Sequence, residues 1–250
     1  MTNIGFVGLG IMGGPMASHL NNNGYNLSVF NRSKEKSEKW ITQNTKAKVC
    51  FSIKDIATEC DIIILCVGND SDVRDVILGK DGMINCLKQG SIIVDHTTTS
   101  SDLSMEINGL LNPNDIFYID APVSGGEAGA QSGQLSIMAG GDKAAFNSIE
   151  NILEPYTKFI KYMGPSGSGQ LTKMVNQICI AGLIQALAEG INFSKKVGLN
   201  TQDVLEVVSK GAAQSWQMDN RWETMTQNKY DYGFAVDLMR KDLDIVLKEA

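Results

Sequence analysis

The sequence is poor in histidine and has no closely paired cysteines. Its 250 residues include two histidines and five cysteines, and no C-x-x-C pair occurs. Zinc sites draw their ligands from clustered Cys and His, so we expect no metal site. An odd number of cysteines without an N-terminal export signal is typical of the reducing cytoplasm, and we expect a cytoplasmic protein.

Basic residues are also scarce relative to acidic ones. The chain has 22 Lys and Arg against 28 Asp and Glu, a formal net charge of -6. Nucleic acids are bound through clustered Lys and Arg, so they are not an expected partner. The longest apolar run, DIIILCVG, is too short to cross a bilayer, and no membrane partner is expected. The sequence does contain 43% hydrophobic residues, which is enough for a well-filled core.

Short β-rich runs alternate with helical patterns over most of the chain. This alternation predicts an α/β fold with a Rossmann-type, doubly wound sheet. Continuous apolar runs such as IIILCV and SIIVD are typical of parallel strands that are covered on both faces. The predicted strands are 4–7, 26–30, 47–50, 61–67, 91–95, 117–120, 134–139 and 159–162, and predicted helices include 12–22, 34–43 and 71–78.

The pattern changes at the glycine-rich segment MGPSGSGQ. Residues 170–197 then form one long predicted helix, whose apolar residues lie almost all round and predict burial in an all-helical second domain or in an interface. Further helices are predicted at 201–210 and 235–249. We therefore expect a nucleotide-binding domain at 1–163 and an all-helical domain at 164–250. The chain ends within a helical pattern, so we expect either another chain or further residues to cover the long helix.

A glycine-rich turn joins the first predicted strand to the first predicted helix. The stretch Gly8-Leu9-Gly10-Ile11-Met12-Gly13 reads G-x-G-x-x-G, and its position between strand and helix is typical of dinucleotide binding. The first glycine permits the tight turn, the second lets backbone approach a pyrophosphate, and the third lets helix and strand pack closely. The alternative is an ordinary strand–helix turn.

The end of the second predicted strand indicates the type of cofactor. NAD sites usually carry an acidic residue there, whereas this sequence has Asn31, Arg32 and Ser33. Arg32 would pair with a 2′-phosphate through two donors and Ser33 would add a hydrogen bond, which favours NADP over NAD. In the alternative, Arg32 is a solvated residue and Asn31 accepts the ribose of either cofactor.

Two further stretches carry candidate substrate-binding and catalytic residues. In DAPVSGG, Ser124, Gly125 and Gly126 follow a strand and would form a nest for a carboxylate; a flexible loop is the alternative. In GQLTKMVNQ, Lys173 and Asn176 share one face of the predicted helix. Lys173 would give a proton to a carbonyl oxygen and Asn176 would orient it or the substrate, unless Lys173 is a surface lysine.

Together the motifs GFVGLGIMGGPMASHL, DAPVSGGEAGAQSG and GPSGSGQLTKMVNQ, followed by Lys241-Asp242-Leu243, resemble the β-hydroxyacid dehydrogenase family. That family includes 3-hydroxyisobutyrate dehydrogenase, tartronate semialdehyde (2-hydroxy-3-oxopropionate) reductase and glyoxylate/succinic semialdehyde reductases. The resemblance implies an oxidoreductase that acts on a small carboxylate substrate with NADP, or less readily NAD. It also implies a homodimer or homotetramer.

The resemblance further implies roles for individual residues. Lys173 is the general acid/base with Asn176 as its neighbour, and Ser124, Gly125 and Gly126 bind the substrate carboxylate. Val67, Thr97, Thr98 and Lys241 match cofactor-contacting positions, and Phe234 and Asp242 match substrate-pocket positions.

Three alternatives remain beside this interpretation. A 6-phosphogluconate dehydrogenase usually has a histidine where Val175 stands, and an imine reductase usually lacks the lysine at position 173. A non-catalytic binding module that kept the fold is the third. Family members continue for further helices after the KDL motif, and the region 214–221 matches no substrate class, so the substrate stays open.

Overall fold

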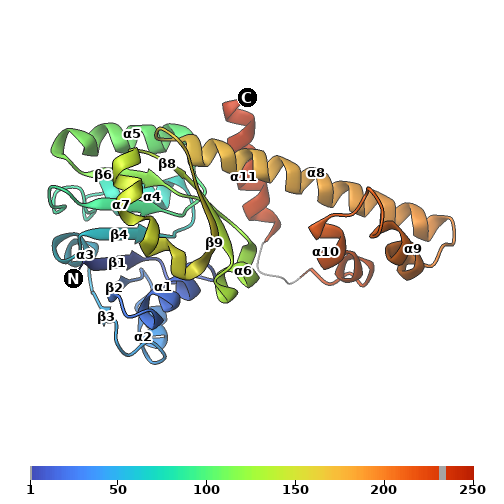
Figure 1. Cartoon of the computed structure of the whole chain (residues 1–250), viewed down its shortest axis with the longest axis horizontal. Helices are drawn as coiled ribbons and strands as arrows, with labels where there is room; N and C mark the ends of the chain where they lie inside the picture. The colour runs from blue at the N-terminus through green and yellow to red at the C-terminus, as the bar shows by residue number, and fades with distance from the viewer. Residues whose placement is uncertain (1, 231–234) are drawn as a thin grey trace. The chain divides into compact units, whose positions relative to one another are not determined.

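The computed structural model describes residues 2–230 and 235–250, and the chain forms two compact units (Figure 1). Unit 1 is Met1–Lys173 and unit 2 is Met174–Ala250. The division lies further along the chain than the boundary after residue 163 that the sequence indicated. The reason is that the first turn of helix α8 (Ser168–Lys196) is hydrogen-bonded to loops of unit 1, as the contacts of Gln170 show below.

In the described residues, unit 1 contains a nine-stranded sheet of order β3-β2-β1-β4-β5-β6-β8-β7, with β9 paired to β8. Strands β1 to β6 run parallel in the order 3-2-1-4-5-6, and β8 is antiparallel to β6 and β7. The chain leaves β1 in one direction for β2 and β3, and returns beside it as β4. Ligands of doubly wound sheets bind at the carboxyl ends of the strands near such a reversal.

The strand bounds follow the sequence predictions to within a few residues, with one addition. Strand β7, only two residues long, was not predicted, since so short a run carries no periodicity. The strands are β1 (Asn3–Val7), β2 (Asn26–Phe30), β3 (Lys48–Val49), β4 (Ile62–Leu65), β5 (Ile92–Asp95), β6 (Phe117–Asp120), β7 (Val123–Ser124), β8 (Leu135–Gly140) and β9 (Thr157–Gly164).

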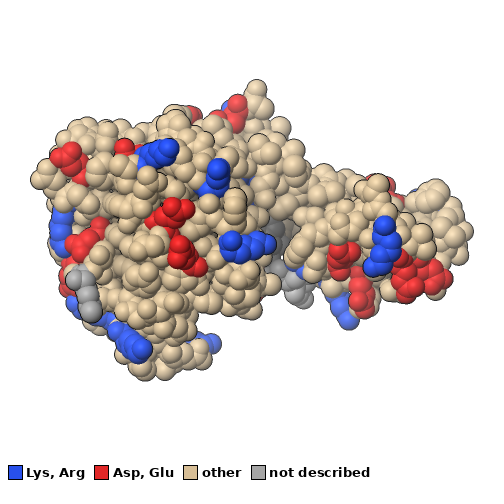
Figure 2. Space-filling model, viewed as in Figure 1, with Lys and Arg blue, Asp and Glu red and all other residues tan. Residues whose placement is uncertain are grey.

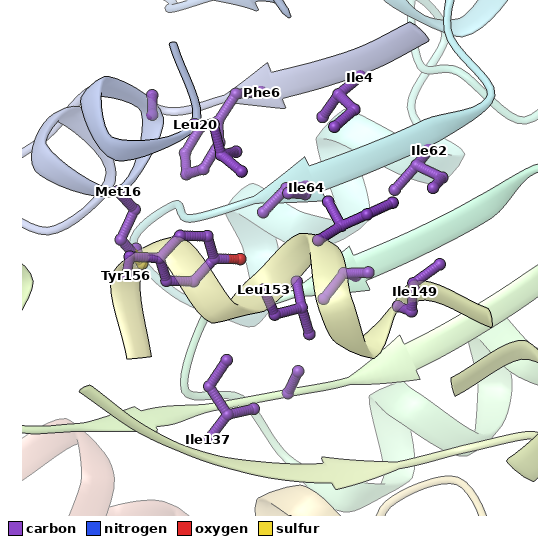
Figure 3. Packing of buried hydrophobic residues seen from close by; sticks show 14 of the residues in the cluster. Ile4, Phe6, Met16, Leu20, Ile62, Ile64, Ile137, Ile149, Leu153 and Tyr156 are labelled. Carbon is purple, nitrogen blue, oxygen red and sulfur yellow. The ribbon is translucent and has the colours of Figure 1, made fainter. Parts of the chain in front are cut away.

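Helices cover both faces of this sheet, which confirms the doubly wound fold. In β4, Ile62 and Ile64 pack into one apolar cluster with α1, α6 and α7 (Figure 3). Ile63 and Leu65 pack into another with α3, α4 and α5. This two-sided burial explains the continuous apolar run. The helices are α1 (Gly13–Asn22), α2 (Lys34–Ile41), α3 (Ile53–Glu59), α4 (Asp70–Leu78), α5 (Ser101–Leu111), α6 (Gly126–Ser132) and α7 (Lys143–Leu153), with 3-10 turns at Asn112–Asn114 and Glu154–Tyr156.

Unit 2 is helical throughout its described residues. Besides the continuation of α8, it contains α9 (Thr201–Val208), α10 (Trp216–Thr226) and α11 (Val236–Glu249). Its core is small and consists of Leu187, Ile191, Met218, Trp222 and Met225. Helix α10 was not predicted; Ser215 caps it by accepting a hydrogen bond from the N–H of Met218 at 3.1 Å.

Within this chain the long helix is only partly buried, and its expected burial in an interface stays a prediction. Val175, Ile178 and Phe193 of α8 are 61%, 51% and 64% exposed, because no described element packs on that side of the helix. By length and composition α8 is apolar enough to cross a membrane, although core helices of soluble proteins pass the same test. On the face drawn in Figure 2, acidic and basic residues of unit 1 are interspersed without a concentrated basic patch.

Candidate functional site

The β1–α1 turn has the form that a dinucleotide requires. A Cβ on Gly8, whose φ is +101°, would collide with the carbonyl oxygen of Cys66, and one on Gly13 would collide with the carbonyl oxygen of Gly8. A Cβ on Gly10 would meet nothing within 4 Å. Two glycines are thus required by the protein's own packing, and the middle one leaves open space where a pyrophosphate can approach backbone. These residues fit a dinucleotide cofactor.

The start of α1 is also suited to an anion. The N-cap residue Met12 makes no side-chain capping bond, and the first turn of the helix has no acidic residue. Leu9 and Ile11 complete the turn between Gly8 and Gly13. An uncapped helix N-terminus presents backbone N–H groups and the positive end of the helix dipole, which favour phosphate.

Asn31 holds this turn to the end of β2. Its Oδ1 accepts a hydrogen bond from the N–H of Leu9 at 2.9 Å, and its Nδ2 donates to the carbonyl oxygen of Ser33 at 3.0 Å. The Asn31 amide is therefore engaged at both ends within the protein. It fixes the turn and the segment Arg32–Ser33 relative to each other.

Arg32 and Ser33, which are expected to recognise the group at the 2′ position of the cofactor's ribose, follow β2. The side chain of Arg32 is 89% exposed and forms an ion pair with Asp72, with Nη1 and Oδ1 3.1 Å apart. The hydroxyl of Ser33 donates to Glu35 at 2.9 Å. Each of them thus has a carboxylate partner.

The loops after β4 and β5 are joined through Thr97. The N–H of Val67 donates to Oγ1 of Thr97 at 3.1 Å, and the N–H of Thr97 donates to Asp95 at 2.8 Å. Thr97 is buried and Thr98 is half-buried beside it. Burial raises the pKa of Asp95 to about 6, against the lowering effect of its hydrogen bonds from Thr97 and Tyr118.

Gln170, which the sequence did not single out, ties this loop to the first turn of α8. Its Oε1 accepts from the N–H of Thr99 at 3.1 Å, and its Nε2 donates to the carbonyl oxygen of Thr97 at 2.8 Å. The side chain is fully buried, so both ends of its amide have the partners that burial demands. The sequence signal was only a polar residue at the start of an apolar helix.

Asp120, at the end of β6, holds the same turn of α8. Its carboxylate accepts from the N–H of Gly167 at 2.8 Å and from the N–H of Gln170 at 3.0 Å. A carboxylate at a helix N-terminus satisfies free N–H groups and opposes the helix dipole. Burial raises the pKa of Asp120 to about 6, although these hydrogen bonds act in the opposite direction.

The start of α8 brings Lys173 to the predicted substrate turn. Lys173 is 7% exposed, and its Nζ donates to the carbonyl oxygen of Val123 at 2.8 Å. Ser124 follows in β7, and Gly125 and Gly126 adopt φ values of +138° and +62° on entering α6. The structure therefore places a buried ammonium beside the Ser-Gly-Gly turn, and a surface lysine is excluded.

In unit 2, three residues predicted to belong to the site, Asn176, Lys241 and Asp242, form one network of polar contacts with Gln177. Asn176 donates to Oε1 of Gln177 at 2.8 Å, and Nε2 of Gln177 donates to Oδ2 of Asp242 at 2.5 Å. Nζ of Lys241 lies 3.1 Å from Oδ1 of Asp242. Asp242 is 4% exposed, so its carboxylate orients Gln177 within the protein. Phe234, the other predicted pocket residue, lies outside the described residues.

The two histidines hold loops and helices together. His96 is buried, with Nδ1 2.6 Å from the carbonyl oxygen of Ala121 and Nε2 2.9 Å from the hydroxyl of Tyr156. Burial lowers its pKa to about 4. His19 joins α1 to the carbonyl oxygens of Ala130 and Gln131. Neither imidazole is placed as a proton-transfer group.

Two family models together match nearly the whole chain. Residues 3–164 match the NAD-binding domain of 6-phosphogluconate dehydrogenase. Residues 167–250 match the NAD-binding domain of NADP-dependent 3-hydroxyisobutyrate dehydrogenase.

Individual proteins with similar sequences or structures agree with these models. An uncharacterized oxidoreductase of Shewanella frigidimarina is 51% identical over 100% of this chain and 86% of its own length. The 2-hydroxy-3-oxopropionate reductase of Escherichia coli is 34% identical over 99% of this chain and 84% of its own length. The solved structure of Mycobacterium tuberculosis 3-hydroxyisobutyrate dehydrogenase with L-serine has a TM-score of 0.89 and 27% identity, covering 100% of this chain and 86% of that one.

Proposed function

Because the chain belongs to the β-hydroxyacid dehydrogenase family, whose members are NAD(P)-binding oxidoreductases, we propose a specific reaction for it. The protein reduces a small semialdehyde or 2-oxo acid, such as tartronate semialdehyde, glyoxylate or succinic semialdehyde. In the reverse direction it oxidises the matching hydroxy acid, such as 3-hydroxyisobutyrate. NADP is its preferred cofactor.

The buried position of Lys173 carries this proposal. Its ammonium lies 2.8 Å from the Val123 carbonyl oxygen, next to Ser124, Gly125 and Gly126, whose hydroxyl and backbone N–H groups are the proposed ligands of a substrate carboxylate. A substrate held there by its carboxylate would present its carbonyl oxygen to Nζ, which donates the proton that the product alcohol keeps. Asn176, one helical turn further on, orients the reacting oxygen or the lysine.

The cofactor would be held by the glycine turn and the residues beside it. Gly8 and Gly13 shape the turn and Gly10 leaves room for the pyrophosphate. Val67 is the proposed contact on the adenosine side, Thr97 and Thr98 lie near the nicotinamide in this proposal, and Lys241 reaches the cofactor or the substrate. When bound, the nicotinamide supplies the hydride or accepts it in the reverse reaction. Arg32 and the missing acidic residue at the end of β2 favour NADP, in agreement with the NADP-dependent family model matched by residues 167–250.

The exposed side of α8 supports self-association. Val175, Ile178 and Phe193 leave an apolar stretch in water, which soluble proteins usually cover by an interface. We propose a cytoplasmic homodimer or homotetramer in which a second copy covers this helix. Sedimentation velocity at several concentrations tests the proposal, which a strictly monomeric protein would contradict.

A substrate survey tests the proposed reaction. Initial rates of NADPH and NADH oxidation are measured with tartronate semialdehyde, glyoxylate, succinic semialdehyde and methylmalonate semialdehyde. We expect oxidation of NADPH with at least one of them, at a higher kcat/KM than for NADH. A protein that binds NADPH tightly but turns over none of these compounds would contradict the proposal and indicate a binding role.

A further inference from the structure

The ion pair at the end of β2 places a carboxylate beside the predicted 2′-phosphate site. Asp72 lies in the first turn of α4, and its Oδ1 is 3.1 Å from Nη1 of Arg32. Its side chain is 25% exposed, whereas that of Arg32 is 89% exposed. The acid is therefore the better anchored of the two partners, and the arginine is the one that can turn toward a ligand.

The structure holds Asp72 in this position from two sides. The N–H of Asp72 donates to Oδ1 of Asn69, the N-cap of α4, at 3.1 Å. Its carboxylate also packs against Gly68, where any Cβ would collide with Oδ2. A side chain larger than glycine at position 68 would displace the carboxylate, so the loop after β4 is shaped around it.

Two other basic side chains of α2 and α4 have carboxylate partners of their own. Lys34 forms an ion pair with Glu38, and Arg74 binds Glu106 through both guanidinium nitrogens. The carboxylate of Glu35 accepts from Ser33, and its pKa is lowered first by a hydrogen bond from its own backbone N–H and then by that from Ser33. A 2′-phosphate bound by Arg32 would thus meet the carboxylate of Asp72 and, beside Ser33, that of Glu35.

From this geometry we propose that Asp72 is a specificity-determining residue that limits the preference for NADP(H) over NAD(H). Its carboxylate competes with the 2′-phosphate for Arg32 and repels that phosphate directly. NAD(H) has only a hydroxyl at this position and meets no such repulsion. The inference rests on the proposed function, in which Arg32 binds the 2′-phosphate.

The size of the effect follows from the exposure of the pair. Exposed ion pairs contribute little, and charges a few ångströms apart near a protein surface interact by amounts that salt reduces. We expect removal of the Asp72 charge to tighten NADPH binding by roughly threefold to tenfold at low salt, and by less at high salt. NADH binding should change by less than about twofold, since its ribose carries no charge there.

Direct binding measurements test the inference. Dissociation constants for NADPH and NADH are measured by nicotinamide fluorescence at low and high salt, without substrate. The variants are Asp72→Asn, Arg32→Ala and, as a matched control, Asp75→Asn, which removes the same charge from an exposed position of α4. We expect Asp72→Asn alone to tighten NADPH selectively, while Arg32→Ala weakens NADPH and spares NADH.

Each other outcome has a distinct meaning. If Arg32→Ala weakens NADPH but Asp72→Asn leaves it unchanged, or weakens it, the inference is wrong and the NADP preference stands. If Asp75→Asn tightens NADPH binding as much as Asp72→Asn does, the effect comes from net charge alone and the inference is overturned. If Arg32→Ala does not affect NADPH at all, the proposed NADP preference itself fails.

Discussion

The two units of the chain differ in the hydrogen-bond partners of their polar site residues. In unit 1, two large apolar clusters enclose the sheet, and site residues such as Gln170 and Asp120 bond to backbone groups inside it. Unit 2 has a five-residue apolar core, and its predicted site residues bond to side chains, from Asn176 through Gln177 to Asp242. Backbone partners are fixed by the fold, whereas side-chain partners also depend on each other's conformations.

This difference concerns where proton transfer and substrate selection are proposed to take place. The proposed proton donor, Lys173, and Ser124 of the proposed substrate turn both belong to unit 1, where Lys173 bonds to the backbone of Val123. Asp242 and Lys241 of unit 2, which the resemblance assigns to the substrate pocket and cofactor, bond to side chains instead. Under the proposed function, we therefore expect substrate preference to depend on unit 2 and proton transfer to depend on unit 1.

The largest stability effect is expected in the core of unit 1. Ile64→Ala removes a fully buried side chain from the sheet and should lower the free energy of unfolding by about 2–5 kcal/mol. Leu187→Ala, in the smaller core of unit 2, should fall at the low end of this range because fewer buried neighbours surround it. Urea denaturation followed by circular dichroism measures both. Equal losses of unfolding free energy in the two variants would contradict the expected difference between the two cores.

A pH-dependent effect is expected from the buried carboxyl of Asp95. Its pKa is raised from 3.8 to about 6, so the folded state holds a proton over a pH range in which the unfolded state has lost it. The stability of the wild type relative to Asp95→Asn should therefore fall as pH rises from about 4 to 6, by about 3 kcal/mol at most. Denaturation of both proteins between these pH values measures the difference. A constant difference would show that the carboxyl titrates normally.

Two glutamines on α8 give a matched test of the units. Gln170→Ala leaves the buried carbonyl oxygen of Thr97 and the N–H of Thr99 without their partner, at a cost of about 2 kcal/mol or more. Gln177→Ala removes the donor to Asp242, and Asn176 can turn to replace it, so we expect a loss of about 1–2 kcal/mol. Thermal unfolding of the two variants compares them. A greater loss of stability for Gln177→Ala than for Gln170→Ala would contradict this expectation.

The smallest effect is expected on the exposed side of α8. Phe193→Ser changes a side chain that is 64% exposed, so the stability of dilute protein should change by less than about 0.5 kcal/mol. The same variant should weaken the proposed self-association, which light scattering measures over a range of concentrations. Unchanged association would place the interface on another surface.

The sequence predicted those parts of the fold that depend on local pattern. The apolar run of β4 and the spacing of Gly8, Gly10 and Gly13 led to the doubly wound sheet and its first turn, and both are confirmed. Local pattern did not predict β7 or α10. The first is too short to show a period, and the second mixes apolar and polar residues so that neither face stands out.

Within the candidate site, the sequence missed residues whose partners lie far along the chain. Gln170 bonds to Thr97 and Thr99 across more than seventy positions, and Arg32 meets Asp72 across forty. These partners could not be identified from the sequence, because only the order of strands in the sheet brings the loops after β2, β4 and β5 to one edge. For a related reason, composition alone did not show whether this chain or an interface covers α8.

The role of Lys173 as proton donor is the central claim, and one comparison tests it most directly. NADPH oxidation with the best substrate and NADPH binding are measured together for the wild type, Lys173→Ala and Lys161→Ala, the last replacing an exposed lysine of β9. We expect Lys173→Ala to lower kcat by about 10²- to 10⁴-fold while NADPH binding is retained, and Lys161→Ala to behave as wild type. A Lys173→Ala variant that binds NADPH and keeps the wild-type rate would contradict the account.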